Sequence, residues 1–92
     1  MEFEWNPEKA QINIKKHSVS FADATTVFND PFAMTFDDPA HSINEQRFIT
    51  IGYSNQNKLI VLSHTDRDEK IRIISAREAT PKERRFYERG NL

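Results

Sequence analysis

Arginines near the end of the chain are the residues best suited to chemistry. Arg72 and Arg77 bracket the end of a stretch with the alternation of a β-strand, and a segment with helical start signals follows. Guanidinium groups on rigid elements bind phosphate oxygens in pairs. The stretch therefore predicts an anion site with Arg72 and Arg77 as phosphate ligands. The competing interpretation of Arg77 is an ion pair with a carboxylate such as Glu83.

The sequence does not decide whether these arginines share a face of the sheet. Strand alternation places Arg72 with Ile74, whereas Arg77 lies beyond the regular alternation. Arg47 and Arg67 extend the possible basic rim as substrate-binding candidates, although such residues are more often plain surface charges.

Proton transfer has its own candidates. His64 ends a predicted central strand, and a histidine can act as acid or base near neutral pH; the alternative is a histidine hydrogen-bonded at a strand end. Tyr87 lies on the same helix face as Glu83 and can donate to a phosphate or stack on a base. We interpret His17, at a helix end, as structural and His41, in an acidic loop, as inert.

Neither a metal nor a cofactor is expected. The chain has no Cys, and Asp37 and Asp38 followed by His41 are weak grounds for a metal site. Absence of Cys fits a reducing compartment. There is no apolar run of membrane-spanning length, and the first residues are acidic, unlike a signal peptide. We expect a cytoplasmic protein without membrane contact.

The length and charge of the chain limit its number of domains and its possible partners. The 92 residues suffice for a single domain covering residues 1–92. A net charge of −1 argues against general nucleic-acid binding, but the charges are uneven. No Lys or Arg occurs between Lys16 and Arg47. The basic residues of the last segment are Lys70, Arg72, Arg77, Lys82, Arg84, Arg85 and Arg89. A solvated helix of mixed charge is the competing interpretation.

The elements that must position these residues can be read from periodicity and caps. Residues 3–5 form a short strand, helices cover 7–16 and about 21–29, strands cover 47–53, 58–65 and 70–76, and a helix covers 81–89. Residues 31–45 read as loop, although Phe32, Met34 and Phe36 alternate like an edge strand. The order β-α-α-β-β-β-α predicts an α+β domain with a small, mostly antiparallel sheet. A helical pair covers one face, and the C-terminal helix covers part of the other, leaving a groove beside the arginines.

Several motifs together resemble one family over nearly the whole chain. They are Phe3-Glu-Trp5-Asn-Pro-Glu-Lys9, Asn13-x-x-Lys16-His17-Ser-Val-Ser-Phe21, Val27-Phe28-x-Asp30-Pro31, Glu45-x-Arg47-Phe-x-x-Ile-Gly52, Ser63-His64-Thr65 and the block from Arg72 to Glu88. In this order they resemble the BrnT toxin family. Asn6 and Ser18 depart from the family's usual Asp and Gly; Asn caps a helix equally well, and Ser makes a left-handed turn costlier.

The resemblance implies a RelE-like fold and a toxin of a type II toxin–antitoxin pair. Such toxins are ribonucleases that arrest translation. A DNA-binding BrnA-like antitoxin neutralises them, and the complex represses its own operon. Contact with DNA would therefore occur only through the antitoxin.

Cleavage of RNA by its own 2′-hydroxyl needs a base, cations for the phosphorane and an acid for the leaving oxygen, and it needs no metal. We therefore predict a metal-independent endoribonuclease with His64, Arg72, Arg77 and Tyr87 as catalytic residues, and Arg47 and Arg67 as substrate ligands. The rival hypothesis is a non-catalytic interaction module whose basic C-terminal helix docks on an acidic partner.

Overall fold

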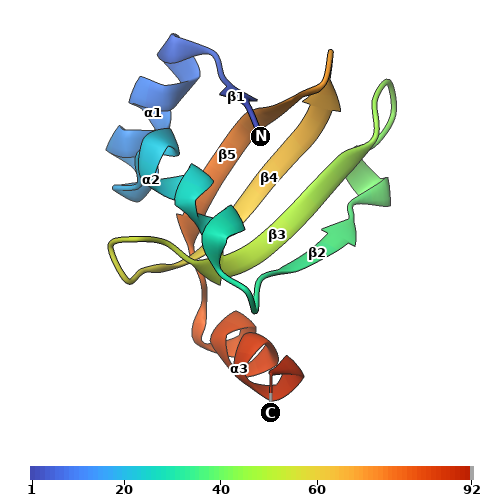
Figure 1. Cartoon of the computed structure of the whole chain (residues 1–92). Helices are drawn as coiled ribbons and strands as arrows, with labels where there is room; N and C mark the ends of the chain where they lie inside the picture. The colour runs from blue at the N-terminus through green and yellow to red at the C-terminus, as the bar shows by residue number, and fades with distance from the viewer. Residues whose placement is uncertain (92) are drawn as a thin grey trace.

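The computed structural model describes residues 1–91 and has three α-helices and one mixed sheet (Figure 1). The elements are β1 (Phe3–Glu4), α1 (Pro7–His17), α2 (Phe21–Thr25), the 3-10 turn η1 (Thr26–Asn29), β2 (Met34–Asp37), the 3-10 turn η2 (Pro39–His41), β3 (Arg47–Tyr53), β4 (Leu59–Arg67), β5 (Lys70–Glu78) and α3 (Pro81–Gly90). The strand order is β1-β5-β4-β3-β2, with β1 parallel to β5 and the other pairs antiparallel. The predicted α+β class, with β4 central, is confirmed.

The structure contains one strand that the predicted order lacks. β2 lies within the region that reads as loop and pairs antiparallel with β3, placing Thr35 opposite Thr50 and Phe36 opposite Ile49. The hydroxyls of Thr35 and Thr50 lie 2.7 Å apart. The alternation of apolar residues before Asp37 therefore does form an edge strand, which gives the sheet its fifth member.

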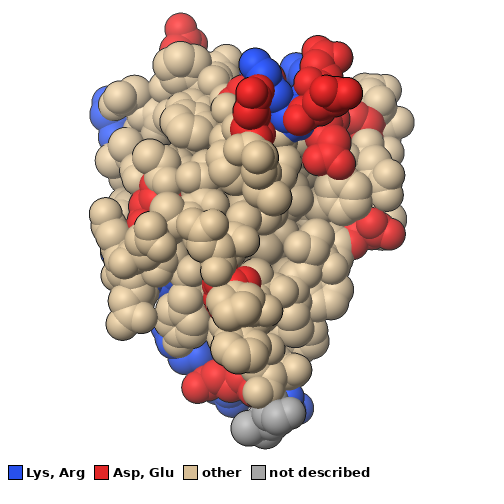
Figure 2. Space-filling model, in the orientation of Figure 1, with Lys and Arg blue, Asp and Glu red and all other residues tan. Residues whose placement is uncertain are grey.

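The helical pair covers one face of the sheet, as predicted. α1, α2 and η1 lie over this face in Figure 1. The buried core between them consists of Val19, Phe21, Ala24, Val27, Ile60, Leu62, Ile73 and Ala76. Charged side chains gather toward the rim of this side of the molecule (Figure 2). Within residues 1–91, no helix combines the length and apolar character needed to cross a membrane.

Caps set the ends of α1. The side-chain oxygen of Asn6 accepts hydrogen bonds from the backbone N–H groups of Glu8 and Lys9, at 2.8 and 3.3 Å. Ser18 ends the helix in the left-handed conformation, with φ of 58°. Glycine adopts this conformation without strain, so Ser18 carries the cost expected for a serine at a left-handed turn. The turn fixes where the last residues of α1 point.

Asn13 anchors α1 to the edge of β5. It is 6% exposed, and its amide nitrogen donates to the carbonyls of Val19 and Ala76, at 2.9 and 2.8 Å. Its oxygen accepts from the N–H of Ala76 at 3.2 Å. The amide thus pairs with both backbone groups of Ala76, as a neighbouring strand would. Asn13 is therefore buried against the sheet, whereas Lys9 and Lys16 on the same helix are exposed.

The other sheet face is covered at one end by α3. Tyr87 is buried with Ile51 and Leu59, and its hydroxyl donates to Asp30 at 2.7 Å. The same carboxylate accepts from the backbone N–H of Tyr53 at 2.8 Å. Burial acts to raise the pKa of Asp30, but these hydrogen bonds hold it below its usual value. The charged carboxylate therefore fixes α3 against the sheet.

A β-bulge decides which way the arginines point. Ser63 pairs with Ser75 and His64 pairs with Ile73, so Ile74 is an extra residue in β5. Arg72 lies opposite Thr65 and Arg77 opposite Val61, two residues of β4 with the same side-chain parity. The bulge therefore puts Arg72 and Arg77 on one face, which simple alternation along β5 does not.

Candidate active site

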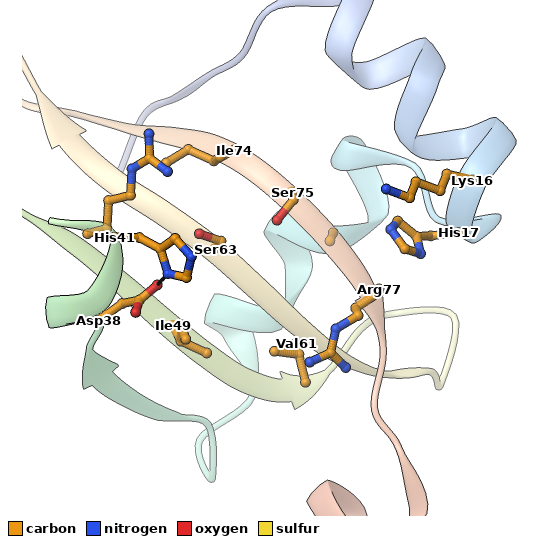
Figure 3. A pocket seen from close by; sticks show the side chains of 12 residues that line it. Lys16, His17, Asp38, His41, Ile49, Val61, Ser63, Ile74, Ser75 and Arg77 are labelled. Atoms are coloured by element: carbon orange, nitrogen blue, oxygen red, sulfur yellow. Dashed lines mark hydrogen bonds and ion pairs between the residues drawn. The ribbon is translucent and has the colours of Figure 1, made fainter. Parts of the chain in front are cut away.

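A hollow of about 420 Å³ opens on the sheet face that α3 leaves partly uncovered (Figure 3). Strands β3, β4 and β5 form its floor. Figure 3 shows Lys16 and His17 on one side of this floor and Asp38 and His41 on the other. The lining residues are Lys16, His17, Asp38, His41, Arg47, Ile49, Val61, Ser63, Ile74, Ser75, Ala76 and Arg77.

His41 and Asp38 form a hydrogen-bonded pair at one wall. His41 Nδ1 lies 2.9 Å from Asp38 Oδ2, and the side chains are 67% and 13% exposed. A carboxylate only accepts, so in the neutral imidazole Nδ1 carries the proton and Nε2 has the free lone pair. In Figure 3 the second ring nitrogen points away from Asp38 toward the hollow. The pair is therefore an oriented proton acceptor.

The opposite wall is the C-terminal end of α1. Lys16 and His17 are among its last residues, where the partial negative charge of the helix end favours cationic groups. Asn13 holds this end against Ala76 of β5, one residue before Arg77. This wall thus brings two potential proton donors to the same hollow as the guanidinium of Arg77.

Arg77 is held by a carboxylate from α3. Its Nη1 and Nη2 lie 2.7 and 2.9 Å from the two oxygens of Glu83, which also accepts from the backbone N–H of Thr80 at 2.9 Å. Thr80 and Glu83 form the predicted capping box. The hydrogen bond to Glu83 raises the pKa of Arg77, and the guanidinium lowers the pKa of Glu83 to about 2. Both stay charged near neutral pH.

Arg47 reaches the hollow from β3. Its Nε lies 3.6 Å from Glu45, beyond hydrogen-bond distance, and this buried nitrogen has no partner among residues 1–91. Glu45 also contacts Arg67, whose Nη2 lies 3.2 Å from its other oxygen. Only Arg47 of this pair of arginines lines the hollow. Arg47 therefore brings to the hollow a guanidinium that is only loosely paired with Glu45.

We expect Glu83→Gln to lower the free energy of unfolding by about 1–2 kcal/mol at pH 7, a value discounted for the partial exposure of the pair. Gln can preserve the capping box through its amide oxygen, so the change removes the charge and one of the two hydrogen bonds from Arg77. Since folding lowers the pKa of Glu83 from 4.5 to about 2, this stabilisation is complete above pH 4.5 and disappears as pH falls toward 2. Urea unfolding across this range checks it.

The matched control is Glu88→Gln, which removes an exposed carboxylate of the same helix. It should leave the free energy of unfolding within about 0.5 kcal/mol of the native value. A Glu83→Gln difference that persisted unchanged at pH 2 would contradict the ion-pair explanation.

His64 lies on the other side of the sheet from the hollow. It is 5% exposed, near the middle of β4 rather than at the strand end predicted, and its ring lies between Phe28 and Phe48, with centroid distances of 5.1 and 5.7 Å. Its Nε2 is 2.8 Å from the Thr50 hydroxyl. Burial lowers the pKa of His64, against the raising effect of the Asp66 charge. The structure thus places a neutral ring in the core.

Arg72 and Tyr87 also lie outside the lining of the hollow. Arg72 pairs with Glu4 of β1, with Nη1 2.6 Å from the carboxylate. Tyr87 is 6% exposed, and its hydroxyl is engaged by Asp30. Burial raises the pKa of Tyr87, and the hydrogen bond to Asp30 adds to this effect. Both side chains are occupied in holding elements together.

The four arginines predicted as phosphate or substrate ligands therefore do not all gather at the hollow. Each of Arg47, Arg67, Arg72 and Arg77 has a glutamate within 4.0 Å, and only Arg47 and Arg77 line the hollow. The hollow instead draws residues from early segments that the sequence interpretation set aside, namely Lys16, His17 and His41. Among residues 1–91, no group of three or more His, Cys, Asp or Glu could hold a metal ion.

Comparison with known families decides where the chain belongs. The sequence profile described as "Ribonuclease toxin, BrnT, of type II toxin-antitoxin system" matches residues 5–83. The chain belongs to the BrnT family. This confirms the resemblance seen in the sequence motifs. Membership makes the protein a ribonuclease toxin by family, and a type II system implies a protein antitoxin as partner.

A solved structure agrees with this assignment. The fold resembles the crystal structure of the Brucella abortus ribonuclease toxin BrnT, with a TM-score of 0.68 and 28% sequence identity over 87% of this chain and 97% of that chain. No curated protein matches this chain significantly. The chain therefore has the fold of the BrnT family, which falls in the α+β class predicted from the sequence.

Proposed function

We propose that the hollow cleaves RNA by metal-independent transesterification. The observation that carries this proposal is the placement of two histidines, His41 and His17, at opposite walls of a hollow that also contains Arg77 and Lys16. In-line displacement at phosphorus needs a base on one side and an acid on the other, with cations between them. Membership of a ribonuclease toxin family supports the choice of RNA.

In the proposed reaction, Nε2 of His41 takes the proton of a ribose 2′-hydroxyl. The freed 2′-oxygen forms a bond to the adjacent phosphorus, and the bond from phosphorus to the 5′-oxygen breaks. Protonated His17 gives its proton to that 5′-oxygen. The products are a 2′,3′-cyclic phosphate and a 5′-hydroxyl. Asp38 acts as a positioning residue, because it fixes the tautomer of His41.

Arg77 keeps its predicted phosphate-binding role, although it is paired. Glu83 engages Nη1 and Nη2, and the carbonyl of Glu78 engages Nη1 at 3.4 Å. These contacts leave Nε–H and one N–H of Nη2, which form a fork suited to two phosphate oxygens. Lys16 and Arg47 add positive charge for the phosphorane. In this proposal, His64, Arg72, Arg67 and Tyr87 support the fold instead of contacting RNA.

Regulation follows the type II pattern in this proposal. The antitoxin is a BrnA-like DNA-binding protein, and the complex represses its own operon in the bacterial cytoplasm. The family membership and the sequence resemblance support this assignment.

We expect the purified protein to cleave RNA equally well with and without EDTA and to leave 2′,3′-cyclic phosphate ends. Arg77→Gln should lower the cleavage rate by about 10²-fold, because it removes a charged ligand of the transition state. Arg72→Gln is the matched control and should retain most activity, since its guanidinium contacts Glu4. Gel analysis with end-group mapping measures each result.

RNA left intact by the native protein would overturn the proposal. It would favour a non-catalytic module that uses the cations of α3, which are Lys82, Arg84, Arg85 and Arg89. Cleavage abolished by EDTA and restored by a divalent ion would overturn only metal independence.

A further inference from the structure

The hollow continues along α1 beyond the residues proposed for catalysis. A second depression of about 170 Å³ adjoins it and shares four lining residues with it, namely Lys16, His17, Ile74 and Ser75. The lining residues that it adds are Lys9, Ile12 and Asn13. The two depressions therefore form one continuous groove. We call the part beside α1 the α1 arm.

The α1 arm is electropositive. Lys9 and Lys16 are two helical turns apart on the same side of α1, about 10 Å along the helix axis. No Asp or Glu belongs to the described lining of this arm. A polyanion leaving the central hollow in this direction meets two successive ammonium groups. The spacing gives Lys9 a phosphate different from the one nearest Lys16.

Between the lysines the arm has an apolar floor. Ile12 is 60% exposed, and Ile74 is the extra residue of the β5 bulge. Both line the arm. Bases of single-stranded RNA are free to lie against side chains while their phosphates contact cations. An apolar floor between two lysines has this pattern.

The groove also extends past the opposite wall, and its chemistry there differs. A depression of about 290 Å³ shares His41 and Arg47 with the hollow, but Glu45 contributes a carboxylate to its lining. Glu45 already pairs with Arg47 and Arg67, so this side presents less unpaired positive charge to an RNA backbone than the α1 arm does. The two ends of the groove therefore differ in the positive charge that they offer to an RNA strand.

We infer that the α1 arm is a subsite for single-stranded RNA next to the scissile linkage, with Lys9 binding a flanking phosphate and Ile12 and Ile74 receiving a base. The inference rests on the proposed function, because the strand that it holds is the one cleaved in the hollow. The toxin would then bind a longer stretch of RNA than the reacting dinucleotide.

The test compares Lys9→Ala with Lys15→Ala, which removes the same charge from a residue of α1 outside the lining of the groove. Fluorescence anisotropy with a 2′-O-methyl oligonucleotide of about twelve nucleotides measures affinity without cleavage. Lys9→Ala should weaken binding roughly three- to tenfold and reduce the salt slope by about 0.7. Lys15→Ala should match the native protein in both respects.

The apolar floor is tested separately. Ile12→Ala should weaken binding of the same oligonucleotide roughly threefold with an unchanged salt slope, because it removes contact area and no charge. Ile14→Ala is the matched control, since Ile14 is also exposed on α1, at 43%, outside the lining of the arm. It should bind as the native protein does.

Equal loss of affinity in Lys9→Ala and Lys15→Ala, or none in either, would overturn the inference. So would a Lys9→Ala variant that binds RNA normally and loses affinity for the antitoxin, since the arm would then be a protein contact. Failure of the proposed function is a separate result, because it appears as unmodified RNA left intact by the native protein.

Discussion

His41→Ala should cleave RNA about 10²- to 10⁴-fold more slowly than the native protein, because it lacks the group that takes the 2′-hydroxyl proton. The side chain is 67% exposed and its described ring contact is to Asp38, so the fold should tolerate the change. The pH–rate profile should lose its acidic limb, which reports protonation of the base. Single-turnover cleavage measured across pH checks both expectations.

Asp38→Asn provides the companion variant. An amide in place of the carboxylate no longer selects the proton on Nδ1 of His41, so the rate should fall, with a smaller change in RNA affinity. Urea unfolding should give nearly native stability for His41→Ala. A folded His41→Ala protein with native activity and a native pH profile would eliminate His41 as the base.

Asn13→Ala should lower the free energy of unfolding by about 3 kcal/mol, because it leaves buried backbone groups of Ala76 and Val19 without partners. The loss should speed local opening of α1 as well. Equilibrium urea unfolding measures the first effect, and hydrogen exchange of the Ala76 amide measures the second.

Gln11→Ala is the matched control, since it shortens an exposed amide side chain of the same helix. It should change stability by less than about 0.5 kcal/mol. If Asn13→Ala were as mild as Gln11→Ala, water would be replacing the amide at the β5 edge, and α1 would be held by its apolar contacts alone.

Local signals predict most of the fold. The alternation of Phe48 and Thr50 against Ile49 and Ile51 gives β3 with its observed bounds, and the cap at Thr80 gives the start of α3. These features depend on neighbours within a few residues, so the sequence contains what is needed. β2 is short and polar on one side, so its own residues are a weak signal for a strand. It forms a strand because it pairs with β3.

The site is less predictable because it depends on distant contacts. The parity of His64 with Ile60 and Leu62, both in the core, is a usable signal for its burial. No local signal indicates that the loop bearing His41 folds over the sheet opposite α1. The bulge at Ile74 has no clear sequence mark either, yet it determines the direction of Arg77.

Glu83 serves two tasks with one carboxylate, since it caps the first turn of α3 and holds the guanidinium of Arg77. Thermodynamic linkage makes these tasks reciprocal. An anion that binds Arg77 in the orientation held by Glu83 stabilises the start of α3, and a protein that unwinds this turn lowers anion affinity by the same factor. The helix terminus can thus report occupancy of the hollow without being part of it.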